Sequence, residues 1–215
     1  FVSWVIVFYI AGLYCKHTLV LKSKLPTTIL NAQLVNTALA VSFFYFIPLF
    51  IIVMIGIYSG GIIDGVDGLS GGGFGAIFSA YAIIAFMQGQ IDISAFSTVV
   101  VGGILAFLWF NIPPARFFNS ETGTMALTTS LTVVAFLTDA VAVLPIIAFL
   151  LIATSASSLI QILSKKFRNG KKVFLVAPLH NHFQALGWPA YKVTMRYWIL
   201  SIILAVVGTI VALVG

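Results

Sequence analysis

The sequence predicts an all-α fold, a polytopic bundle of transmembrane helices with about seven spans. Of its 215 residues, 61% are hydrophobic and only 7% are charged, and the mean hydropathy is +1.14. Soluble domains carry roughly 25% charged residues, so a chain this apolar cannot surround itself with a water-facing shell. The apolar residues also cluster in segments close to the roughly 20 residues that a helix needs to cross a bilayer. Much of the surface must therefore face lipid.

Seven apolar segments are the predicted spans. Residues 123–163 carry Asp139 as their only charge, and one helix of that length would be roughly 60 Å long, so we predict two spans with a tight turn near residues 138–139. No repeat or low-complexity linker interrupts the pattern, which predicts a single integral membrane domain over residues 1–215. The seven segments are 1–14, 36–58, 72–88, 96–111, 123–138, 140–163 and 196–215.

The distribution of basic residues predicts which loops face the cytoplasm. Each span moves the chain across the membrane, so the loops at 59–71, 112–122 and 164–195 share one face. These loops and their helix ends hold 8 of the 11 Lys and Arg residues, and cytoplasmic loops are typically rich in positive charge. We attribute the net charge of +6 to this bias and not to nucleic-acid binding. A single cysteine, Cys15, excludes an internal disulfide and a cysteine-built metal site.

The first cytoplasmic loop contains two carboxylates, Asp64 and Asp67, among several glycines. Carboxylates three residues apart lie on the same side of a helical turn, where they could hold Mg²⁺ or share a proton. Adjacent glycines let the backbone approach a phosphate closely. The alternative is that the Asp-Gly pairs only form a turn between two spans.

The second and third loops add one carboxylate and two histidines. Glu121 falls in the first turn of a helix, where the dipole favours a carboxylate whether or not it binds a ligand. His180 and His182 do not share a helix face, which disfavours a zinc pair and suits contacts to phosphate. The basic run at residues 165–172 is typical of a lipid-facing surface. Trp188, Tyr191, Tyr197 and Trp198 are interpreted as anchors at the membrane interface.

These motifs are similar to those of the phospho-N-acetylmuramoyl-pentapeptide transferase family, in the polyprenyl-phosphate N-acetylhexosamine-1-phosphate transferase superfamily. The resemblance runs from about Phe43 to the C-terminus, and its third motif is specific to the muramoyl branch. In order, the matching residues are Asp64-Gly65-Val66-Asp67-Gly68-Leu69, Phe110-Asn111 with Pro114-Ala115, Glu121-Thr122-Gly123-Thr124, Pro178-Leu179-His180-Asn181-His182-Phe183, Gly187-Trp188-Pro189 and Arg196-Tyr197-Trp198.

The family has ten transmembrane helices, so the resemblance implies that the seven spans are its last seven. The chain begins with Phe1, and its first residues do not predict a signal peptide. We expect the N-terminal part of the family domain, including its aspartate pair, to be absent. Three positions depart from the family pattern. Gly61 stands in place of Asn, Glu121 in place of Asp, and Asn181 in place of the middle histidine of three.

The resemblance implies an enzyme that transfers phospho-N-acetylmuramoyl-pentapeptide from its UDP carrier to undecaprenyl phosphate, giving lipid I and UMP. It implies Mg²⁺ as cofactor and a site at the cytoplasmic face of the bacterial inner membrane, among membrane lipids. A homodimer is an open possibility. By resemblance, Glu121 and Asp64 would bind the metal. Asp64, Asp67 and His180 would be catalytic, and Gly65, Asn111, Phe118 and His182 would bind substrate.

Two other interpretations remain. A sister enzyme that transfers N-acetylglucosamine-1-phosphate would keep the first two loops, but the muramoyl-type third loop argues against it. A non-catalytic membrane protein or transporter would use the carboxylates to line a polar pathway. Asp64, Asp67 and Glu121 lie in loops and not within spans, which argues against a transporter.

Overall fold

The computed structural model describes residues 63–168 and 170–214, which lie in a compact unit spanning Met54–Gly215. Within these residues the chain forms helices and no strands, which confirms the predicted all-α membrane fold. The predicted spans 1–14 and 36–58 lie outside the described residues, as does Gly61. The elements are α3 (Leu69–Met87), α4 (Ile91–Asn111), α5 (Ser120–Leu137), the 3-10 helix η2 (Val141–Val143), α6 (Leu144–Ile147), α7 (Phe149–Phe167), α8 (Leu179–Ala185) and α9 (Ala190–Val214).

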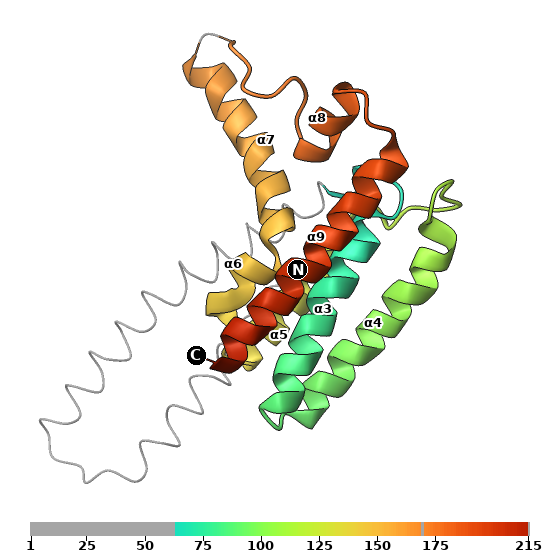
Figure 1. The fold of residues 1–215 in the computed structure, drawn as a ribbon, viewed down its shortest axis with the longest axis vertical. Helices are drawn as coiled ribbons and strands as arrows, with labels where there is room; N and C mark the ends of the chain where they lie inside the picture. The colour runs from blue at the N-terminus through green and yellow to red at the C-terminus, as the bar shows by residue number, and fades with distance from the viewer. Residues whose placement is uncertain (1–62, 169, 215) are drawn as a thin grey trace, which may run out of the picture. The chain divides into compact units, whose positions relative to one another are not determined.

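Helix α3 is the central element, and α4 and α9 pack against it (Figure 1). Over an 18-residue window, 67% of α3 is buried, compared with 22% of α4 and 28% of α9. These three helices of the described part are long and apolar enough to cross a membrane. The outward side chains of α4 and α9 are mostly large and apolar, as expected for a surface in contact with lipid.

The predicted span at 140–163 contains a bend that the sequence did not predict. The chain forms η2 and α6 first, and then bends by 75° into α7, so it is a broken span or a re-entrant segment. The interior face of α7 is polar, whereas its exposed face carries Leu159, Ile162 and Leu163. The mean hydropathy of a segment combines the polar and the apolar face of the helix, so it did not predict the break. The buried polar side chains are Thr154, Ser155, Ser157, Gln161 and Ser164.

Helix α5 occupies the predicted span 123–138, and the predicted turn after it is confirmed. The helix ends at Leu137, and Asp139 follows with a φ of 50°. However, α5 is not among the described helices that are apolar enough to qualify as spans. The hydroxyls of Thr124, Thr128 and Thr132 each donate to the carbonyl four residues earlier, so the helix itself satisfies them. The count of seven spans therefore stays a prediction.

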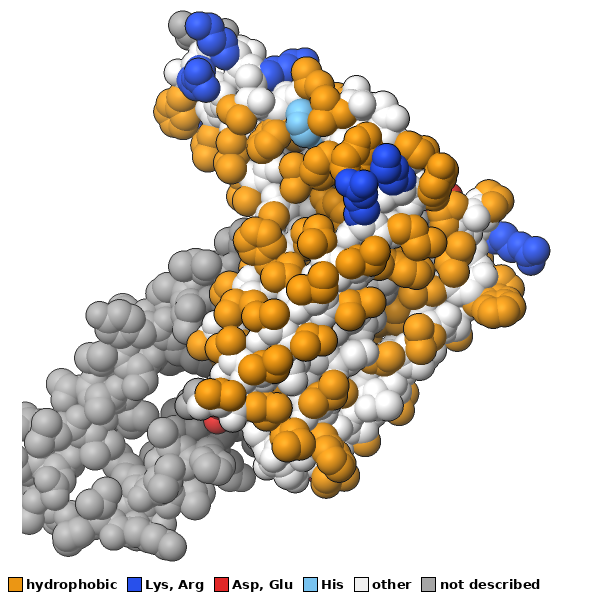
Figure 2. All heavy atoms as spheres, viewed as in Figure 1, with side chains coloured by type: hydrophobic (Ala, Val, Ile, Leu, Met, Phe, Trp, Pro, Cys, Tyr) orange, Lys and Arg blue, Asp and Glu red, His pale blue; other side chains and the backbone are white. Residues whose placement is uncertain are grey.

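Charges separate from apolar side chains along the described part of the molecule. Figure 2 shows Lys and Arg side chains gathered toward one end of the face in view, with hydrophobic side chains covering much of the rest. This end holds the second loop, the C-terminus of α7 and the N-terminus of α9. Asp92 and Asp139 lie at the opposite helix ends. The basic residues are Arg116, Lys165, Lys166, Arg168, Lys171, Lys172, Lys192 and Arg196.

Candidate functional site

The first loop is anchored by apolar residues that leave its carboxylates partly exposed. Ile63 and Val66 are buried, at 1% and 6% exposure, while Asp64 and Asp67 are half-buried. Gly68 ends the loop with a φ of 73°, a left-handed conformation that a residue with a Cβ rarely adopts. The loop therefore turns sharply into α3 and holds both carboxylates at the N-terminal end of this apolar helix.

The turn formed by Asp67 and Gly68, the Asp67 turn, is bound by the second loop. The N–H of Ala115 donates to Asp67 Oδ2 at 3.1 Å, and the N–H of Gly68 donates to Asn111 Oδ1 at 2.9 Å. The other end of the same amide, Asn111 Nδ2, donates to the carbonyl of Phe117 at 2.8 Å. The structure thus brings together the first two loops, as their motifs predicted.

Asn111 is engaged inside the protein. Its side chain is only 1% exposed, and its amide nitrogen and oxygen each bond to the backbone. Sequence reasoning assigned it to substrate, and that contact stays a prediction. Its position at the C-terminus of α4 makes it a bridge between two loops.

Asp64 lies beside the N-terminus of α3. Ser70 Oγ donates to Asp64 Oδ1 at 2.5 Å. Burial raises the pKa of the Asp64 carboxyl above its usual value, against the opposing effects of Ser70 and of the backbone groups of Ser120 and Asn119. These backbone contacts bring the first turn of α5, which carries Glu121, next to Asp64. Sequence reasoning missed Ser70, because a serine at the start of an apolar helix has an ordinary capping explanation.

His180 is enclosed beside the first loop. It is fully buried, and neither ring nitrogen has a hydrogen-bond partner in the described residues. A Cβ at Gly65 would lie 3.0 Å from His180 Nε2, so the imidazole lies directly against this glycine. Burial lowers the pKa of His180 to about 4, which makes it neutral at pH 7. Buried polar groups normally have partners, so these two nitrogens are candidates to bind a ligand.

The third loop is secured to α7, which positions α8. Gln161 Oε1 accepts the N–H groups of Val173 and Phe174, and Ser164 Oγ donates to the carbonyl of Lys171. His182, on α8, accepts the N–H of Leu175 at 3.3 Å. Its ring lies 5.6 Å from Phe174 and 6.1 Å from Phe183, between centroids, so its described contacts lie within the third loop.

Phe118 and Glu121 are exposed, as is Gly65 in the first loop. Phe118 is 61% exposed, whereas the neighbouring Phe117 packs against Phe107 and Phe110 at centroid distances of 5.5 and 5.7 Å. Glu121 is exposed in the first turn of α5. Within the described part, no three His, Cys, Asp or Glu side chains form a group that could hold a metal ion. The predicted metal role of Glu121 and Asp64 stays a prediction.

Helix α9 contributes residues that the sequence interpretation placed elsewhere. The expectation that Tyr197 anchors the helix at the membrane interface is wrong, because it is buried at 5% exposure. Trp198 Nε1 donates to the carbonyl of Gly68 at 2.9 Å, and Thr194 Oγ1 donates to that of Asp67 at 3.0 Å. The matching motif at residues 196–198 was the available signal for Trp198. Nothing in the local pattern pointed to Thr194.

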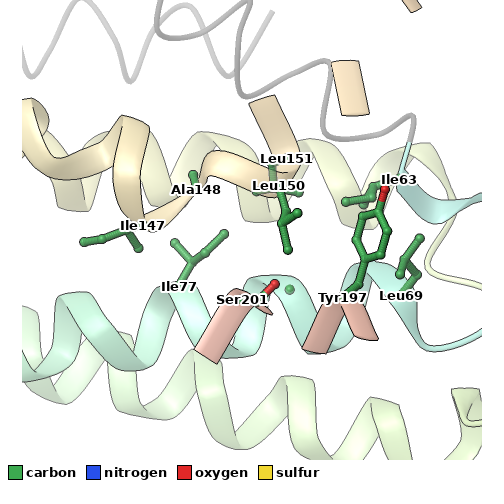
Figure 3. A pocket seen from close by; sticks show the side chains of 10 residues that line it. Ile63, Leu69, Ile77, Ile147, Ala148, Leu150, Leu151, Tyr197 and Ser201 are labelled. Atoms are coloured by element: carbon green, nitrogen blue, oxygen red, sulfur yellow. The ribbon is translucent and has the colours of Figure 1, made fainter. Parts of the chain in front are cut away.

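A narrow apolar hollow underlies the first loop (Figure 3). Ile63, Leu69 and Tyr197 lie near one end, and Ile147 and Ala148 lie toward the other, with Leu150, Leu151 and Ser201 between them. The hollow therefore joins α3, the α6 and α7 bend, and α9 beneath the carboxylates. Its lining is largely aliphatic, so it offers few partners to a buried water.

Comparisons with known proteins agree with the motifs. The model of glycosyl transferase family 4 matches residues 2–139. The match begins well before Phe43, so the similarity extends into the part of the chain where we expected it to be weak. Three similar proteins are phospho-N-acetylmuramoyl-pentapeptide-transferases. They come from Anoxybacillus flavithermus (39% identical over 145 residues, 67% of this chain), Bacillus velezensis (35% over 203 residues, 94%) and Bacillus subtilis (37% over 164 residues, 76%).

The aligned regions cover 44%, 60% and 50% of these relatives, so the chain spans about half of their length. The family model covers more than half of this chain and includes the first two loops of the candidate site. The apolar helices agree with a multi-pass membrane protein. By its sequence, the chain belongs to glycosyl transferase family 4.

Proposed function

We propose that this chain takes part in transferring phospho-N-acetylmuramoyl-pentapeptide from its UDP carrier to undecaprenyl phosphate, giving lipid I and UMP for peptidoglycan synthesis. The observation that carries the proposal is the junction of the Asp67 turn with the second loop, in which Ala115 bonds to Asp67 and Asn111 bonds to Gly68, at the basic end of the apolar helices. One substrate is a lipid and the other is water-soluble, so the reaction needs polar groups at the membrane surface. The names of the similar transferases support the same activity.

The reaction is a phosphoryl transfer. An oxygen of the lipid phosphate bonds to the phosphorus that carries the sugar, and the bond from that phosphorus to the uridylate oxygen breaks, so that UMP leaves. Such transfers depend mainly on positioning and charge stabilisation. Asp67 is held rigidly enough to orient substrate groups, and a neutral His180 offers one donor and one acceptor nitrogen without burying a cation. Gly65, which has no side chain, lets this ring lie directly against the backbone of the loop that carries Asp64 and Asp67.

Mg²⁺ is the proposed metal, because the acidic side chains near the site offer the hard oxygen ligands that it prefers. When bound, it would neutralise charge on the phosphates. The described residues offer suitable oxygen ligands for the ion, but no three of their acidic, histidine or cysteine side chains lie close enough together to hold it. Asp64 and Glu121 would thus supply part of its coordination, and no step above is routed through it.

The proposed location is the bacterial inner membrane, with the site facing the cytoplasm. The clustering of all eight described Lys and Arg residues at one end of the helices supports this orientation. The same charges would favour both an anionic lipid surface and an anionic nucleotide.

The test is transfer of labelled sugar phosphate to undecaprenyl phosphate by the full chain in detergent. Glu121→Gln should lower turnover by a factor on the order of 10², because it removes charge stabilisation from the phosphates. Glu121→Asp should keep activity. Asp92→Asn is the matched control, since Asp92 also lies exposed in the first turn of a helix, but at the opposite end.

Chelation should abolish UMP release, and added Mg²⁺ should restore it. Binding of Mn²⁺, followed by its paramagnetic resonance signal, should weaken in Glu121→Gln and not in Asp92→Asn. A parent chain that forms no lipid-linked sugar, or a Glu121→Gln variant as active as the parent, would count against the proposal.

A further inference from the structure

Two side chains of α9 hold the backbone of the Asp67 turn. Thr194 Oγ1 donates to the carbonyl of Asp67 and Trp198 Nε1 donates to the next carbonyl, that of Gly68. Thr194 and Trp198 are four residues apart, so both donors project from the same face of the helix. Thr194 is 1% exposed, which shields its hydrogen bond from competing water. Helix α9 thus bonds to two consecutive carbonyls of the first loop, although Thr194 lies 127 residues after Asp67 in the sequence.

The opposite side of the turn is fixed by the second loop. Asn111 Oδ1 accepts the N–H of Gly68, and the N–H of Ala115 donates to the Asp67 carboxylate. The backbone and the side chain of Asp67 are therefore restrained by different segments of the chain. Losing the restraint from α9 would leave the carboxylate attached to the second loop alone.

Close packing supports the same contact. A Cβ at Gly72 would lie 2.0 Å from Trp198 Nε1, so only a glycine allows the indole to lie this close to α3. A Cβ at the next residue, Gly73, would meet nothing within 4 Å. Gly72 therefore serves the approach of Trp198, and Gly73 offers a comparison in the same helical turn.

We propose that Thr194 and Trp198 are positioning residues that set the direction of the Asp67 carboxylate. They act through Asp67 and do not touch the reacting groups. The inference rests on the proposed function, in which Asp67 orders the substrate. Displacement of a catalytic group by about 1 Å can lower a rate by about 10²-fold, so a looser turn should mainly reduce turnover.

The first experiment compares Thr194→Val with Thr194→Ser in the full chain. Valine keeps the shape and loses the hydroxyl, and serine keeps the hydroxyl. We expect kcat to fall about tenfold or more in Thr194→Val and KM to change little, while Thr194→Ser retains activity close to that of the parent. Trp198→Phe, which removes the indole N–H, should behave like Thr194→Val. Equal activity of the valine and serine variants would overturn the inference.

The second experiment compares Gly72→Ala with Gly73→Ala, which make the same chemical change one residue apart. Gly72→Ala should displace Trp198 and lower kcat as Trp198→Phe does, and Gly73→Ala should not. Similar losses in both variants would mean that α3, and not the contact with Trp198, is responsible.

Hydrogen exchange separates this inference from the proposed function. The amides of Gly68 and Ala115 should exchange faster in Thr194→Val and Trp198→Phe than in the parent or in Thr194→Ser, whether or not the chain is active. A parent without transfer activity would overturn the proposed function, and the exchange rates would still decide whether α9 holds the turn. Unchanged exchange in both variants would overturn the positioning role.

Discussion

The two ends of the second loop both contain residues that the sequence predicted for the site, but they differ in their exposure to solvent. Asn111, at the start of the loop, is 1% exposed and bonds through both ends of its amide. Phe118 and Glu121, at its end, are exposed, and Phe118 reaches 61%. Asn111 and Glu121 both belong to stretches that match the family. The difference teaches that one region organises the site before any ligand binds, whereas the other has surface available for a ligand.

This difference separates stability from activity. In the buried region, a substitution breaks contacts within the protein and should affect folding and transfer together. In the exposed region, a substitution should change transfer or substrate affinity and leave stability nearly unchanged.

The largest effect is expected for Asn111→Leu. The substitution leaves the buried N–H of Gly68 without a partner, which costs about 1–3 kcal/mol, and it also removes the donor to the part-buried carbonyl of Phe117. We expect a large drop in the denaturation midpoint in detergent and loss of transfer activity. If the variant kept the denaturation midpoint of the parent and lost transfer activity, Asn111 would act on the ligand and not on stability.

The next effect concerns pH and His180. Its pKa is about 4 in the folded protein and about 6.5 when unfolded, so the unfolded state binds more protons between these values. Stability contributed by His180 is therefore present above pH 6.5 and is lost as the pH falls toward 4. From pH 7 to pH 5 the loss should be about 2 kcal/mol. The raised pKa of Asp64 acts in the opposite direction, because it favours the folded state at lower pH.

Denaturation midpoints at pH 7 and pH 5 measure this effect. His180→Leu should flatten the pH dependence, and His182→Leu, a change of the neighbouring half-buried histidine, should retain it. An unchanged slope in His180→Leu would show that His180 is not the responsible group.

The smallest effect is expected for Phe118→Ala. The exposed ring contributes little to packing, so stability should change by less than about 0.5 kcal/mol. If the ring stacks on the uracil base, its loss should raise KM for the UDP-linked substrate about two- to tenfold, as expected for an aromatic contact of about 0.5–1.5 kcal/mol. Phe117→Ala is the control, because Phe117 is 46% exposed but packs on Phe107 and Phe110, so its loss should mainly lower stability. The reverse outcome would exchange the roles of the two rings.

Local sequence patterns predicted where the helices lie in the chain better than whether they are straight or bent. Span length and charge placed α3, α4 and α9, and a lone charge predicted the turn at Asp139. The same patterns missed the 75° break before α7. Hydropathy records how apolar a segment is, but a break depends on what each face of the helix packs against. The interior face of α7 is rich in Ser and Thr, and that information is lost in an average.

Composition and motifs by themselves determined that this chain is a helical membrane protein of a transferase family, with Asp64, Asp67, Asn111 and His180 near one surface. Only the tertiary structure decided that the neutral His180 lies against Gly65 and that Thr194 and Trp198 grip the Asp67 turn. The physical reason is sequence distance. A hydrogen bond between residues 127 positions apart leaves no periodic trace in either segment, because its donor and acceptor are a hydroxyl and a backbone carbonyl that many other residues could also provide.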